Sequence, residues 1–134
     1  MAFYEWKKNK VWLWKAYDPC KKRVVGFALG GRDDRTLKKL LDKISLNNRI
    51  FVTDDFEAYH PCIPENQHFT GKDLTFPVEQ DNSNTRHYLA RSRRKSKVSS
   101  RSLEMVELSL VLLNYLIIPE NMAIYLNIFQ STFR

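Results

Sequence analysis

The sequence predicts an α/β domain in which helices flank a mixed β-sheet. Three observations point to this fold class. Segments rich in aromatic and β-branched residues alternate with segments of helical periodicity, the predicted order is strand, strand, helix, strand, helix, helix, and 43% of the 134 residues are apolar. A chain of this composition can bury a core, so residues 1–134 are expected to form one domain with a helical C-terminal region at about 77–118.

The first half is predicted to form a hairpin, a helix and a further strand. Residues 11–18 and 23–30 form the hairpin, and its turn begins at Asp18. Asp33 or Asp34 then caps a helix that runs to about Ser45. The apolar residues at helical spacing are Leu37, Leu40, Leu41 and Ile44, which places three lysines in water: Lys38, Lys39 and Lys43.

A strand at residues 49–53 follows that helix. A strand after such a crossover usually pairs in parallel with an earlier strand. Ahead of Val11 the chain offers only residues 3–6 for that partner. The first strand is therefore expected to be short or missing, and the sheet to be incomplete on this side.

The second half is predicted to be mainly helical. Residues 55–60 form a short helix, a short strand follows at 67–70, and Pro77 opens a helix over residues 76–95. A last helix covers residues 102–118 and is too short for a membrane span, which needs about 20 apolar residues. It is expected to be buried in the core or in a subunit contact. The apolar tail after it is expected to pack as well: Ile124, Leu126, Ile128 and Phe129.

Charge and cysteine content narrow the function classes. A net charge of +7 favours a polyanionic partner, either nucleic acid or an anionic membrane. Cys20 and Cys62 lack the spacing of a zinc site or a disulfide framework and are expected to be reduced thiols. The N-terminus lacks the apolar segment of a signal peptide, which favours a cytoplasmic location.

A basic tract from Arg86 to Arg101 favours DNA. It contains seven cations and no acid. These are Arg86, Arg91, Arg93, Arg94, Lys95, Lys97 and Arg101. Cations of this kind contact backbone phosphates, and His87 is placed to do the same. A solvated, non-binding surface remains the alternative for this tract.

Two interpretations fit the aspartates at the end of strand 49–53. Ligand sites in open α/β sheets form beyond the carboxyl ends of the strands, and a carboxylate at Asp54 would bind a metal ion there. Alternatively, Asp54 and Asp55 cap the helix predicted for residues 55–60. The local sequence leaves both open.

Glu79 favours the metal interpretation. It lies in the first turn of the helix that starts near Pro77, and 24 residues separate it from Asp54, enough for a loop and a short strand to return to the same sheet edge. Asn82, Arg86 and Arg93 follow on the same helical face. The face thus combines a metal-binding acid, an amide and cations for phosphate, although a solvated polar face would look similar.

Several stretches together resemble a known family. They are TD after an apolar strand, VEQDN after the gap of 24 residues, RHYLARSRRKS, and the segment LEMVELSL. On these stretches the chain resembles the transposases of the insertion sequence 1 (IS-one) family over nearly its whole length. The resemblance implies an RNase H-like catalytic domain that carries out DNA transposition by phosphodiester hydrolysis and strand transfer at transposon ends.

The resemblance also implies a site of the Asp, Asp, Glu type. By position Asp54 is the second aspartate and Glu79 the glutamate, and both would bind Mg²⁺ or Mn²⁺. Asp55 and Asn82 would lie beside these ligands without binding the metal, and Arg86 matches a basic residue that follows the glutamate. The implied partners are double-stranded DNA, as transposon ends and target, and further copies of the full-length protein, with no membrane involved.

The first aspartate of that site is missing from the sequence. The family places it on the opening strand in a DExW-like motif, whereas no Asp precedes Asp18 here. Glu5 would substitute only if its strand register turned it toward Asp54. The chain is therefore expected to be shortened at its N-terminus, as a downstream reading frame or a decayed copy. Two alternatives to the transposase are an inactive DNA-binding fragment that inhibits transposition and a nuclease of the same fold with a different substrate.

Overall fold

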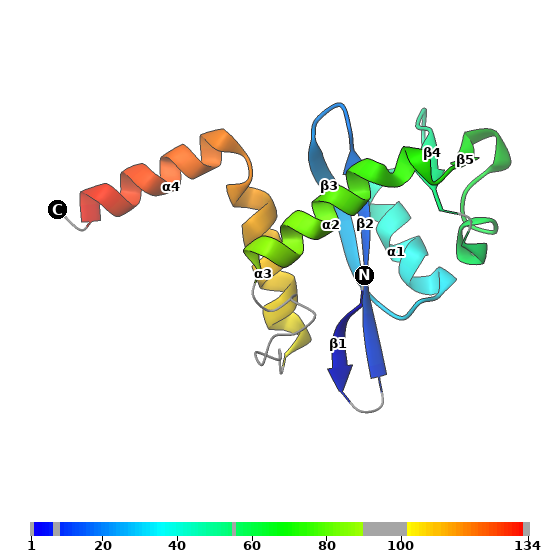
Figure 1. Cartoon of the computed structure of the whole chain (residues 1–134), viewed down its shortest axis with the longest axis horizontal. Helices are drawn as coiled ribbons and strands as arrows, with labels where there is room; N and C mark the ends of the chain where they lie inside the picture. The colour runs from blue at the N-terminus through cyan, green and yellow to red at the C-terminus, as the bar shows by residue number, and fades with distance from the viewer. Residues whose placement is uncertain (1, 7–8, 55, 90–101, 133–134) are drawn as a thin grey trace. The chain divides into compact units, whose positions relative to one another are not determined.

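A computed structural model describes residues 2–6, 9–54, 56–89 and 102–132 of the chain (Figure 1). The chain divides into two compact units, residues 1–99 and residues 100–134. Unit 1 contains the strands and the first two helices, and unit 2 contains two further helices.

Unit 1 is built on a three-stranded antiparallel sheet in the order β1-β2-β3. The strands are β1 (Ala2–Trp6), β2 (Asn9–Asp18) and β3 (Arg23–Gly30), so the predicted hairpin is confirmed. Its turn begins as predicted, because Asp18 Oδ1 accepts hydrogen bonds from the backbone N–H groups of the two residues at positions 20 and 21. The first strand is short, as expected, and pairs with the first part of β2.

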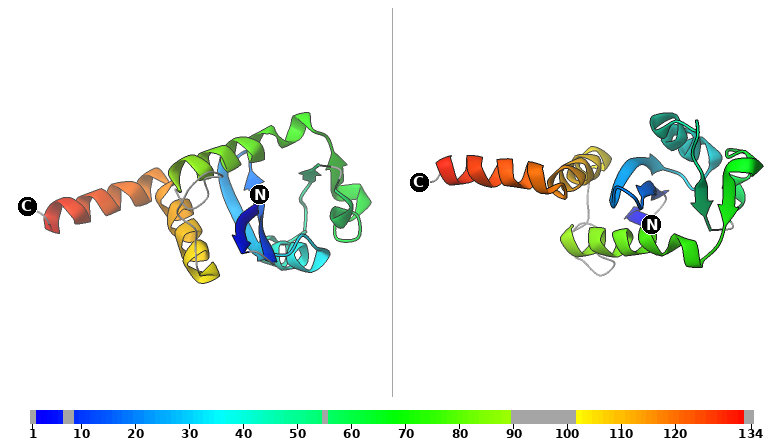
Figure 2. Two further views of the ribbon diagram at one scale, coloured as in Figure 1. Left: turned by 60° about the horizontal axis from the view of Figure 1, so that its bottom comes forward. Right: turned by 90° about the horizontal axis from the view of Figure 1, so that it is seen from above.

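Helix α1 (Asp34–Ile44) covers one face of this sheet (Figure 2). Asp33 is its cap, and Asp33 Oδ1 accepts from Thr36 N at 3.0 Å and from Thr36 Oγ1 at 2.7 Å. All four apolar residues predicted for the inner face are buried, and the three predicted outer lysines are exposed. The buried residues of this core are Trp14, Ala28, Leu37, Leu40, Leu41, Ile44 and Ile63.

Two short strands form a separate parallel sheet, β4 (Phe51–Thr53) with β5 (His68–Thr70). The strand predicted at 67–70 is thus confirmed. The prediction that β4 docks in parallel beside the first strand is wrong, since in the described part of the chain β1 pairs only with β2. In place of the one mixed sheet that was predicted, the described residues form two small sheets. A three-residue strand satisfies its backbone groups with one neighbour, and β5 supplies that neighbour.

The α-helix predicted at residues 55–60 is also wrong. The structure has single 3₁₀ turns in this region: η1 (Glu57–Tyr59), η2 (Glu65–Gln67) and, before the next helix, η3 (Asp73–Thr75). The aromatic side chains of this region pack on the core, and the backbone forms short turns in place of a regular α-helix. Trp14 and Tyr59 meet edge to face, with ring centroids 5.7 Å apart.

Helix α2 (Phe76–Tyr88) lies across the face of the three-stranded sheet opposite α1 (Figure 2). Its start agrees with the prediction, with Pro77 in the first turn. Its predicted end at residue 95 is wrong, because Leu89 is extended, with φ −101° and ψ 105°. Good helix-forming residues continue past this point, but propensity is only a weak determinant of where a helix ends.

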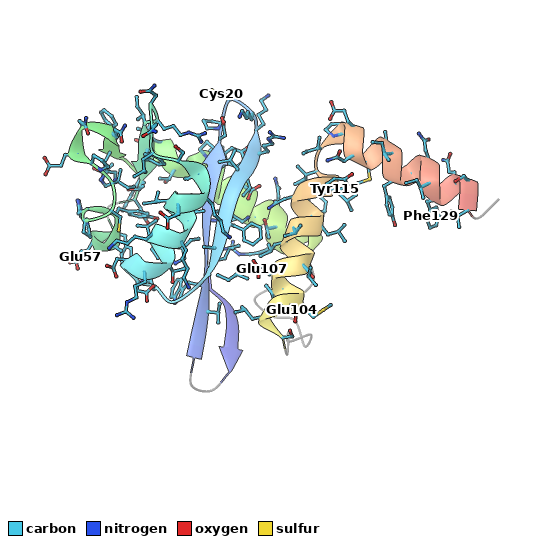
Figure 3. The ribbon with its side chains drawn as sticks, turned by 180° about the vertical axis from the view of Figure 1, so that it is seen from behind. Cys20, Glu57, Glu104, Glu107, Tyr115 and Phe129 are labelled. Carbon is cyan, nitrogen blue, oxygen red and sulfur yellow. The ribbon has the colours of Figure 1, made fainter. Side chains whose placement is uncertain are left out.

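Unit 2 consists of α3 (Leu103–Leu116) and α4 (Pro119–Thr132). The predicted last helix is confirmed, and Ser102 caps it. Burial in the core holds for Val106 and Leu110, whereas most other apolar side chains of α3 are exposed. In the described residues α4 has no buried side chain either, and Tyr115 and Phe129 project from their helices (Figure 3). The other alternative for this apolar segment, a subunit contact, stays a prediction.

Among the described helices, none by itself has the length and apolar character needed to cross a membrane. Helices α3 and α4 meet that requirement only as a pair, and they are bent by 100° at the break between them.

Candidate active site

Asp54 directly follows β4, at the end of a strand whose carbonyl groups are fixed by neighbours. Thr53 O accepts a hydrogen bond from Gly71 N at 3.2 Å, and Thr53 Oγ1 donates to Asp54 O at 2.8 Å. The ring of His68 lies 2.6 Å from the same hydroxyl through Nε2. The carboxylate of Asp54 is exposed, at the carboxyl end of its strand as the sequence predicts.

The capping interpretation of Asp54 is wrong. The turn that follows has Phe56 at its N-cap position, with no side-chain cap hydrogen bond. Asp55 lies outside the described residues. Asp54 instead acts on Tyr59, whose pKa is raised to about 12, first by burial and then by the Asp54 carboxylate, while Arg32 opposes the shift.

The start of α2 is tied to the end of β4. Gly71 bonds to Thr53, Leu74 N donates to Gly71 O at 3.3 Å, and η3 then leads directly into the helix. The turn η3 contacts both β4 and α2. Glu79 lies in the first turn of α2 and is exposed. The structure thus links the two elements that carry Asp54 and Glu79 through Gly71 and η3.

A buried polar cluster fixes α2 to the sheet. Lys15 Nζ of β2 lies 2.5 Å from both Asp81 Oδ2 and Thr85 Oγ1. Thr85 Oγ1 also donates to Asp81 O at 2.9 Å. Asp81 and Thr85 are the buried residues of α2, so this helix is held by charge and hydrogen bonds where α1 is held by apolar packing. Burial lowers the pKa of Lys15, against the opposing effect of Asp81.

Sequence reasoning missed this cluster. The signal was a lysine in the middle of the apolar strand VWLWKAYD, where a cation needs a partner once the strand is covered on that face. Its partners lie 66 and 70 residues further along the chain, and no local pattern indicates them.

Part of the predicted functional face lies on the described part of α2, and its role stays a prediction. Asn82 and Arg86 are half-buried, next to the exposed Glu79, and His87 is exposed, with its ring 5.1 Å from that of Tyr88. The remaining cations of the basic tract lie outside the described residues: Arg91, Arg93, Arg94, Lys95, Lys97 and Arg101. The predicted alignment of Arg93 with this face is therefore untested, and the helix ends before it.

A complete three-residue metal site is not seen. Within the described ranges, no three side chains of the His, Cys, Asp or Glu types are grouped so as to hold a metal ion. Cys20 is exposed and Cys62 half-buried, and both are free thiols, as expected. The side chain of Glu5 is outside the described part of the structure.

Arg32 is a second residue that sequence reasoning missed. It follows β3, and its guanidinium lies over the ring of Phe56 at 4.1 Å and over that of Trp12 at 4.9 Å. Phe56 is two residues from Asp54, so this cation lies beside the segment that leaves β4. Single surface arginines are common, and nothing in the sequence distinguishes this one from its neighbour Arg35.

Comparison with known proteins identifies the family. The model of the IS1 transposase family matches residues 1–119. The chain belongs to the IS1 transposase family. This family relation makes transposition of an insertion sequence the general setting of the protein, and it agrees with the resemblance seen in the sequence.

Individual relatives in this family support the assignment. The chain is 33% identical over 107 residues to the insertion element iso-IS1n protein InsB of Shigella dysenteriae, which covers 79% of this chain and 82% of that protein. It is 35% identical over 100 residues to the insertion element IS1 protein InsB of Shigella sonnei, covering 74% and 76% of the two chains. The same identity holds for the insertion element IS1 9 protein InsB of Escherichia coli K12, of which 60% is covered. No solved structure matches the chain.

Proposed function

We propose that this chain carries the catalytic site of an IS1-type DNA transposase, in which Asp54 and Glu79 bind one divalent cation, Mg²⁺ or Mn²⁺. The observation that supports the proposal is the bond between Gly71 and Thr53, because it ties the segment that leads into α2 to the end of β4. Membership in the transposase family supplies the reaction: hydrolysis of a phosphodiester at a transposon end, followed by strand transfer to target DNA.

The architecture supports an RNase H-like fold for unit 1. An antiparallel group of three strands is followed by a helix on one face, a parallel strand pair and a helix on the opposite face. The candidate carboxylates lie at the end of a strand and in the first turn of the last of these helices. This is the arrangement in which an open α/β sheet forms a site at its edge.

The residues present fit a hard cation in part. Asp54 and Glu79 are exposed carboxylates, and the described part of the chain contains no cationic side chain in an ion pair with either. Mg²⁺ prefers oxygen ligands and keeps several waters, so two carboxylates can hold it without a closed cage. A bound metal ion would supply activation of the attacking hydroxyl and stabilisation of the leaving oxygen.

The chain's own residues have separate tasks in this proposal. Asp54 and Glu79 would hold the metal ion. The family resemblance assigns Asn82 and Asp55 to positions beside these ligands. Arg86, His87 and the basic tract bind the DNA backbone in this proposal. The proposed setting is double-stranded DNA in the cytoplasm, with further copies of the protein joining two DNA ends.

Metal binding tests the pair of carboxylates. Mn²⁺ affinity of the full chain is measured by calorimetry for wild type, Asp54→Asn and Glu79→Gln. Each variant removes one ligand and is expected to weaken binding about tenfold or more. The control is Glu57→Gln, an exposed acid on the outer side of unit 1 (Figure 3), and it should bind as wild type does. Equal affinities in all four proteins would refute the shared site.

A second experiment tests the reaction. Mg²⁺-dependent cleavage of duplex DNA bearing transposon ends is assayed for the chain as given and for a version with an N-terminal extension that carries a DExW-like aspartate. Cleavage by the extended protein, abolished by Asp54→Asn, is the expected result. Cleavage that persists in Asp54→Asn would show that another site does the chemistry. Equal cleavage of unrelated DNA would favour a general nuclease.

One observation favours an alternative function. The candidate site offers two exposed carboxylates, Asp54 and Glu79, and two ligands hold a divalent cation less firmly than three, which would leave a chain that binds DNA without cutting it. In that case it would inhibit transposition by occupying transposon ends or by joining full-length subunits. Adding the chain to an active transposase reaction separates the two: inhibition without cleavage supports the alternative.

A further inference from the structure

Arg32 presents a cation whose position is fixed before any ligand arrives. Its guanidinium carbon is 4.1 Å from the ring centroid of Phe56 and 4.9 Å from that of Trp12. The backbone beside it is held as well, since Trp14 Nε1 donates to Gly31 O at 2.9 Å. Contacts with two rings restrict the side chain and reduce the entropy that it would lose on binding a ligand.

The charge of Arg32 is not neutralised by the nearby acids. Asp33 accepts two hydrogen bonds from Thr36, and Asp34 lies 3.7 Å from Lys38. No ion pair joins Arg32 to a carboxylate in the described ranges, and the residue is exposed. Ring faces attract the cation but do not satisfy the in-plane N–H groups of the guanidinium, which are suited to a planar or tetrahedral oxyanion.

Arg32 also lies close to the candidate active site. Phe56, which it covers, is two residues beyond Asp54. The Asp54 carboxylate and the Arg32 guanidinium both act on the phenol of Tyr59, with opposite effects on its pKa. A DNA strand that reaches Asp54 would therefore bring its backbone phosphates near this guanidinium.

We propose that Arg32 binds a backbone phosphate of the DNA strand that enters the site at Asp54. The inference rests on the proposed function for its ligand, because DNA is the polyanion that a transposase handles. Its competitor is a structural role, in which the arginine merely covers the aromatic cluster with its stem and guanidinium. The two roles differ in whether the charge matters, and substitution by methionine, which keeps an apolar side chain over the rings, separates them.

Salt-dependent DNA binding is the first test. Affinity of the full chain for duplex DNA is measured by fluorescence anisotropy between about 50 and 200 mM salt for wild type, Arg32→Met and Arg35→Met. At the lowest salt concentration, Arg32→Met is expected to bind the duplex about tenfold more weakly than wild type does. Its log–log salt slope should be smaller by about 0.9, which corresponds to the removal of one bond to a phosphate. Arg35 is an exposed cation three residues away and serves as the matched control, with an unchanged slope expected.

A second measurement keeps the proposal falsifiable if Arg32→Met is also less stable. Duplexes that carry single neutral methylphosphonate groups are bound to wild type and to Arg32→Met. A methylphosphonate at one position should weaken DNA binding by wild type and leave binding by Arg32→Met unchanged. That position identifies the contacted phosphate. If every substitution weakens both proteins equally, or if Arg32→Met and Arg35→Met have the same slope, Arg32 does not bind a phosphate and the proposal is wrong.

Failure of this inference is distinguishable from failure of the proposed function. Arg32→Met should retain the Mn²⁺ affinity of wild type, because it removes no metal ligand. If wild type fails to bind Mn²⁺ through Asp54 and Glu79, the catalytic proposal is wrong, whereas the comparison of Arg32→Met with Arg35→Met still decides whether Arg32 contacts DNA.

Discussion

Lys15 is the residue on which the placement of α2 depends. Its side chain is 4% exposed, and its charge is matched through Asp81 and the hydroxyl of Thr85. Burying two charges costs about as much as their attraction returns, so such a pair adds little net stability. Removing one partner is different, because the other charge then remains buried without compensation.

The first prediction concerns this pair. Lys15→Met should lower the free energy of unfolding by about 3 kcal/mol, because Asp81 is left buried without a cation. The double variant Lys15→Met/Asp81→Leu should recover most of that loss. Urea denaturation of the two variants measures the effect, with Lys39→Met, an exposed lysine of α1, as the control that should stay near wild type. Additive losses in the double variant would show that the two residues do not interact.

The second prediction is the pH dependence of the same pair. Burial lowers the pKa of Lys15 below the 10.5 of an unfolded lysine, so between these two values the unfolded chain binds the proton more tightly. The free energy of unfolding therefore rises with pH across that window. Below the lowered pKa, Lys15 is charged in both states, and the full cost of burying its charge is present. The unfolding free energy of wild type should be compared with that of Lys15→Met/Asp81→Leu. The difference, wild type minus variant, should increase as pH approaches 10.5. A difference that decreases over this window would contradict the assignment.

At the scale of elements, α1 and α2 are fixed to the sheet in different ways. The helix α1 packs an apolar face directly over β3, where Gly26 leaves the space for it. A Cβ added at Gly26 would lie 2.6 Å from Ile44 Cγ2 and 3.2 Å from Leu40 Cδ1. The helix α2 has buried only Asp81 and Thr85, so its position is set by a few directional bonds.

The third prediction tests the close approach of α1 to β3. Gly26→Ala should destabilise unit 1 by about 1–3 kcal/mol, because the contacted Ile44 methyl belongs to a branched, buried side chain that cannot swing away. Gly71→Ala is the matched control, since its Cβ would meet Leu74 Cδ1 at an ordinary 3.4 Å. Thermal unfolding of both variants provides the measurement. A larger loss for Gly71→Ala would place the tight packing elsewhere.

At the scale of the whole molecule, the excess of positive charge should dominate DNA binding. The chain carries 22 Lys and Arg against 15 Asp and Glu, and seven of the cations fall between Arg86 and Arg101. Each cation that binds a phosphate adds about 0.9 to the log–log salt slope. The summed field also steers a polyanion toward the protein before specific contacts form.

The fourth prediction concerns the basic tract. Replacing Arg93, Arg94, Lys95 and Lys97 together by glutamine should weaken binding to any duplex and lower the salt slope by about 0.9 for each of these cations that binds a phosphate. Anisotropy titrations at several salt concentrations measure both quantities. A control variant replaces four exposed lysines outside the tract: Lys21, Lys22, Lys38 and Lys39. If this control lowers the slope as much, the tract has no special role and the net charge alone accounts for binding.

The sequence by itself determined the local elements and the family. The hairpin, α1 with its Asp33 cap, the start of α2 and the course of α3 follow from periodicity and capping residues, which act over a few positions. The spacing from TD to VEQDN carried the transposase resemblance, which the family match confirmed.

Tertiary structure alone decided the pairing of β4 with β5, the end of α2 at Tyr88, and the bond from Lys15 to Asp81. These features depend on contacts between residues distant in the sequence, where the gain of a partner outweighs local propensity. Lys15 and Asp81 are 66 positions apart, so neither residue carries a local sign of the other. The bond between Lys15 and Asp81 helps to hold α2, which carries Glu79, against the sheet. For this reason only the folded chain shows how the candidate site is held.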